Sequence, residues 1–133
     1  MSHFTSVETK IHDLICLELA LKDLNYAFTK AEAEQFVTVK GYLGQTTEAT
    51  ISIHASKTYD IGVKVTASGV SFVADWWGVE TTRGVTEKEF VSAVKQRYAY
   101  HKVMQEIRKK GYTLAEEEVT EDNHIRIRVR SWE

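Results

Sequence analysis

The middle of the chain alternates apolar and polar residues, and this pattern limits the fold more than any other feature of the sequence. Residues 49–54 and 61–65 carry an apolar side chain at every second position, as a strand with one buried face does. The predicted strands of this block cover residues 35–39, 49–54, 61–65 and 70–74. Gly41-Tyr42-Leu43-Gly44 and Ala67-Ser68-Gly69 are expected to be turns. Strands joined by short connections pair antiparallel, so we predict a mostly antiparallel sheet.

A leucine-rich segment near the N-terminus has the spacing of a helix. Four of its leucines recur at intervals of three and four residues and so lie along one stripe: Leu14, Leu17, Leu21 and Leu24. Asp13 is a good N-cap, because its carboxylate can accept a hydrogen bond from a free backbone N–H. Ile15 and Leu19 widen the stripe, so we expect this helix to be tucked deeply against the sheet.

A second helix is predicted over residues 87–110, with clear signals at both ends. Thr86 and Glu89 have the spacing of a capping box, in which each side chain accepts a hydrogen bond from the backbone of the other residue. Gly111 suits the position after the last turn, which often adopts a left-handed conformation.

The C-terminal segment is predicted to form a hairpin of strands 114–119 and 124–130. A two-residue loop would place Glu118 opposite Ile127, whereas a three-residue loop matches charges and apolar faces. The favoured register pairs Glu118 with Arg126, Glu116 with Arg128, Val119 with Ile125 and Ala115 with Val129.

These elements, with a weak strand at residues 3–10, follow the order β-α-β-β-β-β-α-β-β. Clusters of strands separated by single helices are typical of the α+β class. We therefore expect a mostly antiparallel sheet with two helices packed on one face. The length of 133 residues suits a single domain over positions 1–133.

Composition and motifs exclude several classes of function. The single cysteine, Cys16, rules out a disulfide framework, and the five histidines lack the spacing of metal ligands. No cofactor motif is present, so we expect neither a metal nor a cofactor. The start lacks the pattern of a signal peptide, and no apolar run reaches the roughly 18 residues of a membrane span. We expect a cytoplasmic protein without membrane insertion.

Nucleic acid is an unlikely partner on grounds of charge. Lys95, Lys102 and Lys109 recur every seven residues and form a basic stripe. The net charge is nevertheless −2, and the acidic residues clustered at 116–122 would repel phosphates. A solvated helix face is the better interpretation of the stripe.

Arg97 and His101 stand out as candidate binding residues of the second helix. They lie four residues apart, side by side, within its apolar sector. A buried arginine needs an acidic partner, for which Asp75 and Glu117 are candidates. Two interpretations stay open: a structural polar network, or a ligand- or partner-binding site. The candidate residues of such a site are Arg97, Tyr98, Tyr100, His101, Asp75 and Glu117.

Trp76 and Trp77 are adjacent residues at the expected end of a strand. On an extended segment such neighbours point to opposite faces, so one is expected in the core and the other exposed. An exposed tryptophan is a common anchor of protein interfaces. The alternative is that both rings pack at the strand end.

Several segments together resemble one known family over essentially the whole chain. These segments are Met1–Thr5, Lys22–Leu24, Gly41–Gln45, Tyr59–Gly62, Gln96–His101 and the Arg-Val-Arg-Ser-Trp sequence at 128–132. In this order and at these intervals they resemble the family called hypothetical chloroplast reading frame thirty-five, of which Gln96–His101 is the most specific part. The family occurs in cyanobacteria, algal plastids and some other bacteria and phages, and its function is unknown. The resemblance carries over no catalytic residue.

Without a catalytic motif, and with one tryptophan expected to be exposed, the sequence favours a non-enzymatic accessory or adaptor protein that binds another protein. The resemblance implies two candidate partners: an AAA-type ATPase, encoded near genes of this family, or a photosynthesis-related assembly. In an alga the location would be the plastid stroma. The alternative is a small-molecule or anion-binding domain with a pocket near Arg97 and His101. An enzyme with His101 as general base would need a nucleophile that the sequence does not identify.

Overall fold

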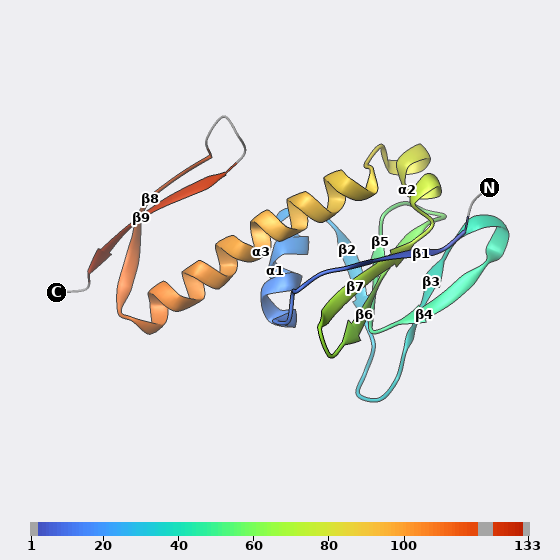
Figure 1. Ribbon diagram of the computed structural model, residues 1–133, viewed down its shortest axis with the longest axis horizontal. Helices are drawn as coiled ribbons and strands as arrows, with labels where there is room; N and C mark the ends of the chain where they lie inside the picture. The colour runs from blue at the N-terminus through green and yellow to red at the C-terminus, as the bar shows by residue number, and fades with distance from the viewer. Residues whose placement is uncertain (1–2, 120–123, 132–133) are drawn as a thin grey trace.

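The computed structural model describes residues 3–119 and 124–131 (Figure 1). Its elements are β1 (Thr5–Glu8), α1 (Leu14–Asp23), β2 (Ala27–Lys30), β3 (Val37–Lys40), the 3₁₀ helix η1 (Tyr42–Gly44), β4 (Thr46–Ala49), β5 (Ile51–His54), β6 (Asp60–Thr66), β7 (Gly69–Ala74), α2 (Trp76–Arg83), α3 (Glu87–Lys109), β8 (Tyr112–Val119) and β9 (Ile125–Ser131). Five strands form an antiparallel sheet in the order β1-β7-β6-β5-β2, while β3 pairs with β4 and β8 with β9. The predicted α+β class is confirmed.

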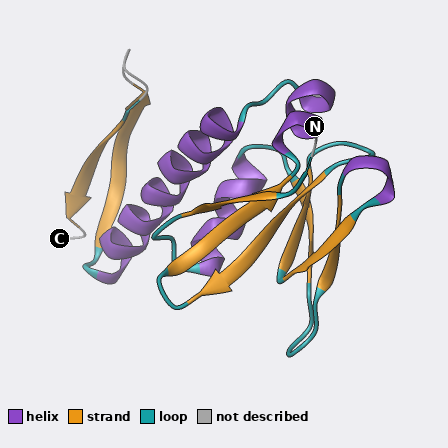
Figure 2. Cartoon of the chain, turned by 45° about the vertical axis from the view of Figure 1, so that its right-hand side comes forward, coloured by secondary structure: helices purple, strands orange, loops and turns teal. Residues whose placement is uncertain are grey.

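Helices α1 and α3 cover one face of the five-stranded sheet (Figure 2). The buried core between helices and sheet includes Leu17, Leu21, Phe90 and Val94 from the helices and Ile51, Ile53, Ile61, Val63 and Phe72 from the sheet. The β3–β4 ribbon covers the opposite face, close to Gly62. A Cβ atom at Gly62 would lie 2.8 Å from Val39 and 3.1 Å from Ala49. The central strands are therefore buried on both faces.

Three helices or strands, β2, β4 and α2, are absent from the sequence prediction, and of β4 only Ala49 lies in a predicted strand. Strand β2 forms at the edge of the sheet, where Ala27 pairs with His54 and Lys30 with Ile51. Asp75 and the two residues after it were expected to be extended. Instead, Asp75 caps α2 by accepting a hydrogen bond from the Gly78 N–H at 3.1 Å. The predicted strand at 49–54 is interrupted at Thr50, between β4 and β5.

The deep burial predicted for the outer residues of α1 is wrong. Ile15 is 69% exposed and Leu19 is 37% exposed, so the helix buries a narrower stripe than its sequence indicates. The helix packs against α3 and places Leu17 and Leu21 in the core with the sheet, while Ile15 and Leu19 lie on a side that is open to solvent. The predicted N-cap is confirmed, because Asp13 accepts a hydrogen bond from the Cys16 N–H at 3.1 Å.

The hairpin of β8 and β9 follows α3, turns back beside it and lies on the side of α3 that faces away from the five-stranded sheet (Figure 1). Its register confirms the predicted pairs Glu118–Arg126, Glu116–Arg128 and Val119–Ile125. The fourth predicted pair is wrong, because Leu114 rather than Ala115 lies opposite Val129. A register shift between Leu114 and Glu116 inserts one residue into β8, as in a β-bulge.

The capping box of α3 offers a direct test of the local structure. The Thr86 hydroxyl accepts from the Glu89 N–H at 3.1 Å, and the Glu89 carboxylate accepts from the Thr86 N–H at 3.1 Å. Replacing Thr86 by alanine is expected to lower the free energy of unfolding by about 1 kcal/mol, because one free N–H of the first turn loses its acceptor. Urea unfolding followed by circular dichroism measures the change. Thr86→Ser should be close to wild type, and equal loss in both variants would contradict the cap.

Candidate functional site

Arg97 and His101 meet at one acidic residue, Asp23, the last residue of α1. Arg97 donates to Asp23 Oδ2 from Nε at 3.0 Å and from Nη2 at 2.6 Å. His101 Nε2 lies 2.6 Å from the same oxygen. A carboxylate at the C-terminus of a helix faces the negative end of the helix dipole, so these two bases also offset an unfavourable position.

The surroundings of Asp23 favour its charged form. Partial burial acts to raise the pKa of the Asp23 carboxyl, but the hydrogen bonds and charges of Arg97 and His101 outweigh it and hold the pKa below the ordinary value of 3.8. The Arg97 guanidinium also lies 4.3 Å from the centre of the Tyr100 ring. With 23% of the Arg97 side chain and 15% of the His101 side chain exposed, the cluster is half-buried.

The same stretch of α3 holds the other end of α1. The Tyr98 hydroxyl accepts a hydrogen bond from the Asp13 N–H at 3.1 Å. The Asp13 carboxylate, besides capping α1, lies 3.4 Å from Lys102 Nζ. We call this set the α1–α3 clamp: Asp13, Asp23, Arg97, Tyr98, His101 and Lys102. The motif at 96–101 thus contacts α1 at both of its ends.

Asp75, a candidate partner of Arg97 by sequence, has a different role. Its Oδ1 caps α2, and its buried Oδ2 has no hydrogen-bond partner in the described part of the chain. The predicted pairing of Arg97 with Asp75 is therefore wrong. Glu117, the other candidate, lies in β8 opposite Ile127, and its side chain is outside the described residues.

Trp76 and Trp77 differ in exposure as predicted, but for another reason. They occupy the first turn of α2, where successive side chains are about 100° apart around the axis. Trp76 is 8% exposed and donates from Nε1 to the Thr5 carbonyl at 3.2 Å. Trp77 is 57% exposed, and its ring stands edge-to-face against Tyr42 with centroids 6.3 Å apart.

An exposed apolar turn lies beside Trp77. Leu43, in the middle of η1, is 84% exposed, and its backbone is left-handed with φ 50° and ψ 41°. An open pocket of about 570 Å³ adjoins this turn and is lined by residues 40–46 and 57–59. We call Tyr42, Leu43, Trp77 and this pocket the η1 surface.

The pocket of the η1 surface has a basic lining. Its charged residues are Lys40 and Lys57, and Lys40 Nζ donates to the Lys57 carbonyl at 2.7 Å. Tyr59 also lines it, and burial, followed by the nearby Asp75 carboxylate, raises the pKa of this phenol. At neutral pH the pocket therefore presents two positive charges and a neutral hydroxyl.

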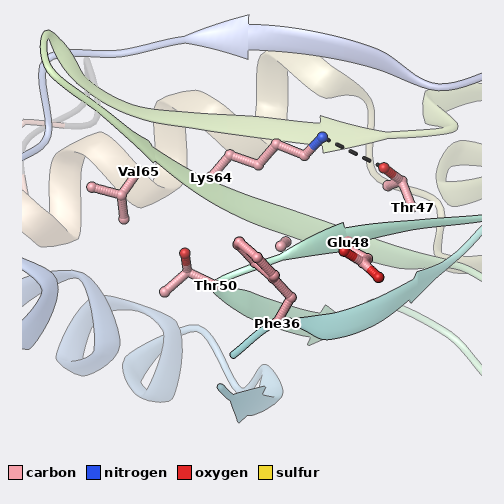
Figure 3. A pocket seen from close by; sticks show the side chains of 7 residues that line it. Phe36, Thr47, Glu48, Thr50, Lys64 and Val65 are labelled. Atoms are coloured by element: carbon pink, nitrogen blue, oxygen red, sulfur yellow. Dashed lines mark hydrogen bonds between the residues drawn. The ribbon is translucent and has the colours of Figure 1, made fainter. Parts of the chain in front are cut away.

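Two other pockets lack the combination of apolar and basic residues found at the η1 surface. One of about 550 Å³ lies between Phe36 and strands β4 and β6, and Figure 3 shows the Lys64 side chain extended toward Thr47 within it, at 3.4 Å. This lining contains one base, Lys64, and one acid, Glu48, so it has no net charge. Another, of about 580 Å³, lies beside Lys95. Neither Arg97 nor His101 lines any of these three pockets.

The exposed side chain of Leu43 was not predicted from the sequence, in which residues 41–44 indicate only a turn. A usable signal was present. Small and polar residues are usual in turns, whereas this turn places two large apolar side chains, Tyr42 and Leu43, between two glycines. Since a turn of this length lies at the surface, its apolar residues should have suggested an exposed patch.

Residues 3–119 and 124–131 were also compared with the requirements of a metal site, a membrane span and a reactive thiol. In these ranges no group of three His, Cys, Asp or Glu side chains could hold a metal ion. No helix there is long and apolar enough to cross a membrane. Burial raises the pKa of the Cys16 thiol, which disfavours the reactive thiolate.

Comparison with known proteins identifies relatives of the whole chain. A family model described as "Protein of unknown function (DUF1257)" matches residues 20–128. Proteins named "Uncharacterized protein ycf35" from Guillardia theta and Cyanophora paradoxa are each 31% identical to this chain, over 99% of it and 98% of the relative. One of the same name from Pyropia yezoensis is 22% identical over the same shares. No solved structure matches. These names confirm the resemblance found in the sequence motifs, and the chain belongs to the DUF1257 family of proteins of unknown function.

Proposed function

We propose that this protein is an accessory protein that binds a protein partner through the η1 surface. The observation that carries the proposal is Leu43. A leucine that is 84% exposed contributes little apolar burial to the fold, and a left-handed backbone costs a residue with a Cβ about 1–2 kcal/mol. Strain at an exposed position that does not serve the fold is typical of functional sites.

The composition of the η1 surface supports a particular kind of partner segment. Leu43 and the Trp77 ring would contact an apolar side chain, as interface anchors do. Lys40 and Lys57 would contact carboxylates beside it. The partner segment is therefore acidic with an apolar anchor. An AAA-type ATPase or a photosynthesis-related assembly are the partners that the family resemblance implies, in the cytoplasm or, in an alga, in the plastid stroma.

The alternative of an anion or small-molecule site at Arg97 and His101 has weaker support. Asp23 already accepts hydrogen bonds from Arg97 and lies against His101, so an incoming anion would have to displace a carboxylate.

Capture from host extract at near-physiological salt tests the η1 surface. A partner bound by the tagged wild-type protein should be lost with Leu43→Asn and with Trp77→Ala. Asparagine tolerates the left-handed conformation, so Leu43→Asn removes the apolar side chain without adding strain. Quantitative mass spectrometry compares the bound proteins.

The matched control is Ile15→Ala, which removes another exposed apolar side chain on α1. It should capture the same partner as wild type. Equal capture by all three variants, with their folds intact by circular dichroism, would refute a role for the η1 surface.

A further inference from the structure

Three side chains on neighbouring strands form a continuous chain of hydrogen bonds that the η1 surface does not use. His54 in β5 lies with Nδ1 3.1 Å from Asp60 Oδ1 and with Nε2 2.8 Å from Thr29 Oγ1. Thr29 is in β2, at the edge of the sheet, and Asp60 begins β6. Side chains two residues apart share a face, so the pairings Thr29–Ser52 and His54–Asp60 place all three on one side of the sheet.

The three hydrogen-bonded side chains become more exposed from the acid through the histidine to the hydroxyl, which is the order that an activated hydroxyl requires. The Asp60 side chain is 1% exposed, the His54 side chain is 40% exposed, and Thr29 is exposed. The second carboxylate oxygen, Asp60 Oδ2, accepts the Lys40 N–H at 2.9 Å, which fixes the carboxylate in place. The acid is thus held inside the protein, while the hydroxyl stands at the surface where a reactant can reach it.

The partners of His54 decide which nitrogen carries the proton. An ionised carboxylate can only accept, so Nδ1 must donate to Asp60 when the imidazole is neutral. Nε2 is then left with its lone pair, and it accepts the hydrogen of the Thr29 hydroxyl. In this tautomer the three groups have the order of a nucleophilic triad: Thr29 is the nucleophile, His54 the general base, and Asp60 the acid that orients the base.

We propose that Thr29, His54 and Asp60 form a nucleophilic relay, and that activated acyl esters acylate the Thr29 hydroxyl. Thr29 Oγ1 forms a bond to the carbonyl carbon while the hydroxyl proton passes to His54 Nε2. The bond from that carbon to the leaving oxygen then breaks, and the proton is transferred to the leaving oxygen. Water then attacks the acyl carbon while His54 Nε2 takes its proton. The bond from that carbon to Thr29 Oγ1 breaks, the proton passes from His54 to Oγ1, and the free acid leaves. Esters with good leaving groups suit a surface hydroxyl, because they react when the nucleophile alone is activated.

The probe for this relay is p-nitrophenyl acetate with the full-length protein at neutral pH. We expect release of p-nitrophenol together with one acetyl group on Thr29, found by peptide mass spectrometry. Thr29→Val should abolish this adduct, and Thr29→Ser, which keeps the hydroxyl, should retain it. Thr38→Val, at another exposed strand threonine, should not change it.

His54→Gln separates a chemical role from a structural one. Glutamine can still hydrogen-bond to its neighbours but cannot take the proton, so acylation of Thr29 should fall about 100-fold or more. Acetyl groups found only on lysines, or an equal rate of Thr29 acylation in His54→Gln, would overturn the proposal. Should His54→Gln not fold, the contrast between Thr29→Ser and Thr29→Val decides, since equal p-nitrophenol release by those two variants would also refute the relay.

Discussion

Replacing Gly69 by alanine is expected to lower the free energy of unfolding by about 3 kcal/mol or more. A Cβ atom at this position would lie 2.4 Å from the Thr9 carbonyl oxygen and 3.0 Å from Lys10 Cα. These are backbone atoms, held in place because the Thr9 N–H donates to the Val70 carbonyl and the Val70 N–H donates to the Ile11 carbonyl. The φ of 136° at Gly69 is also one that residues with a Cβ rarely adopt, so steric overlap and backbone strain add. Urea unfolding measures the loss.

Gly84→Ala is the control that separates these two costs. Gly84 has a positive φ of 82°, but nothing lies within 4 Å of its would-be Cβ. Only backbone strain remains in this variant, and we expect the free energy of unfolding to fall by about 1 kcal/mol. Equal losses in the two variants would show that residues 9–11 do not pack against the turn before β7 as described.

The elements that the sequence predicts well are those whose signals are local. Helix α3 begins at a capping box and is followed by Gly111 at φ 77°, and both signals lie within a few residues of the helix end. Strand β2 has no such signal. Phe28 is its one large apolar residue, and the strand exists because β5 offers it an edge. Pairing with a partner more than 20 residues away cannot be predicted from the four residues of β2.

Helix α2 shows how a correct local signal was missed. Asp75 is a residue type that favours N-caps, but the two tryptophans after it follow the strand predicted at 70–74 and indicate its extended end. The glycine is required by packing, because a Cβ at Gly78 would lie 2.0 Å from the Tyr59 ring. Packing against Tyr59 thus requires in α2 a glycine that intrinsic helix propensity disfavours.

In the candidate site, too, the features set by local spacing were predicted and those set by tertiary packing were not. Helical periodicity predicted that Arg97 and His101 lie side by side on the inner face of α3. It could not predict their partner, because Asp23 is 74 residues from Arg97 along the chain and reaches it only through the packing of α1 against α3. The relay of Thr29, His54 and Asp60 depends on strand pairing and was equally hidden. Trp77 was predicted as one of two candidates, and only the packing of α2 shows which ring is exposed.

Replacing Asp23 by alanine is expected to lower the free energy of unfolding by about 2 kcal/mol at pH 7. Hydrogen bonds to charged groups contribute about 1.5–3 kcal/mol each, and the 33% exposure of the Asp23 side chain reduces this through solvent screening. The pKa of Asp23 is lowered in the folded state, so its contribution is complete above the ordinary carboxyl value of 3.8 and is lost as the pH falls through the lowered folded value. Urea unfolding of both proteins across this range measures the difference.

The Asp23→Ala variant also distinguishes the clamp from a ligand site. A clamp fastens α1 and leaves the η1 surface unchanged, so the folded variant should capture the same partner as wild type. An anion site at Arg97 and His101 would instead gain affinity once the competing carboxylate is removed, and thermal shift with inorganic phosphate would detect this gain. Arg97→Lys is the companion variant, because lysine keeps the charge but cannot reproduce the two guanidinium bonds to one oxygen. A stability difference between wild type and Asp23→Ala that stays constant from pH 7 to well below 3.8 would show that the carboxylate charge is not what holds α1 to α3.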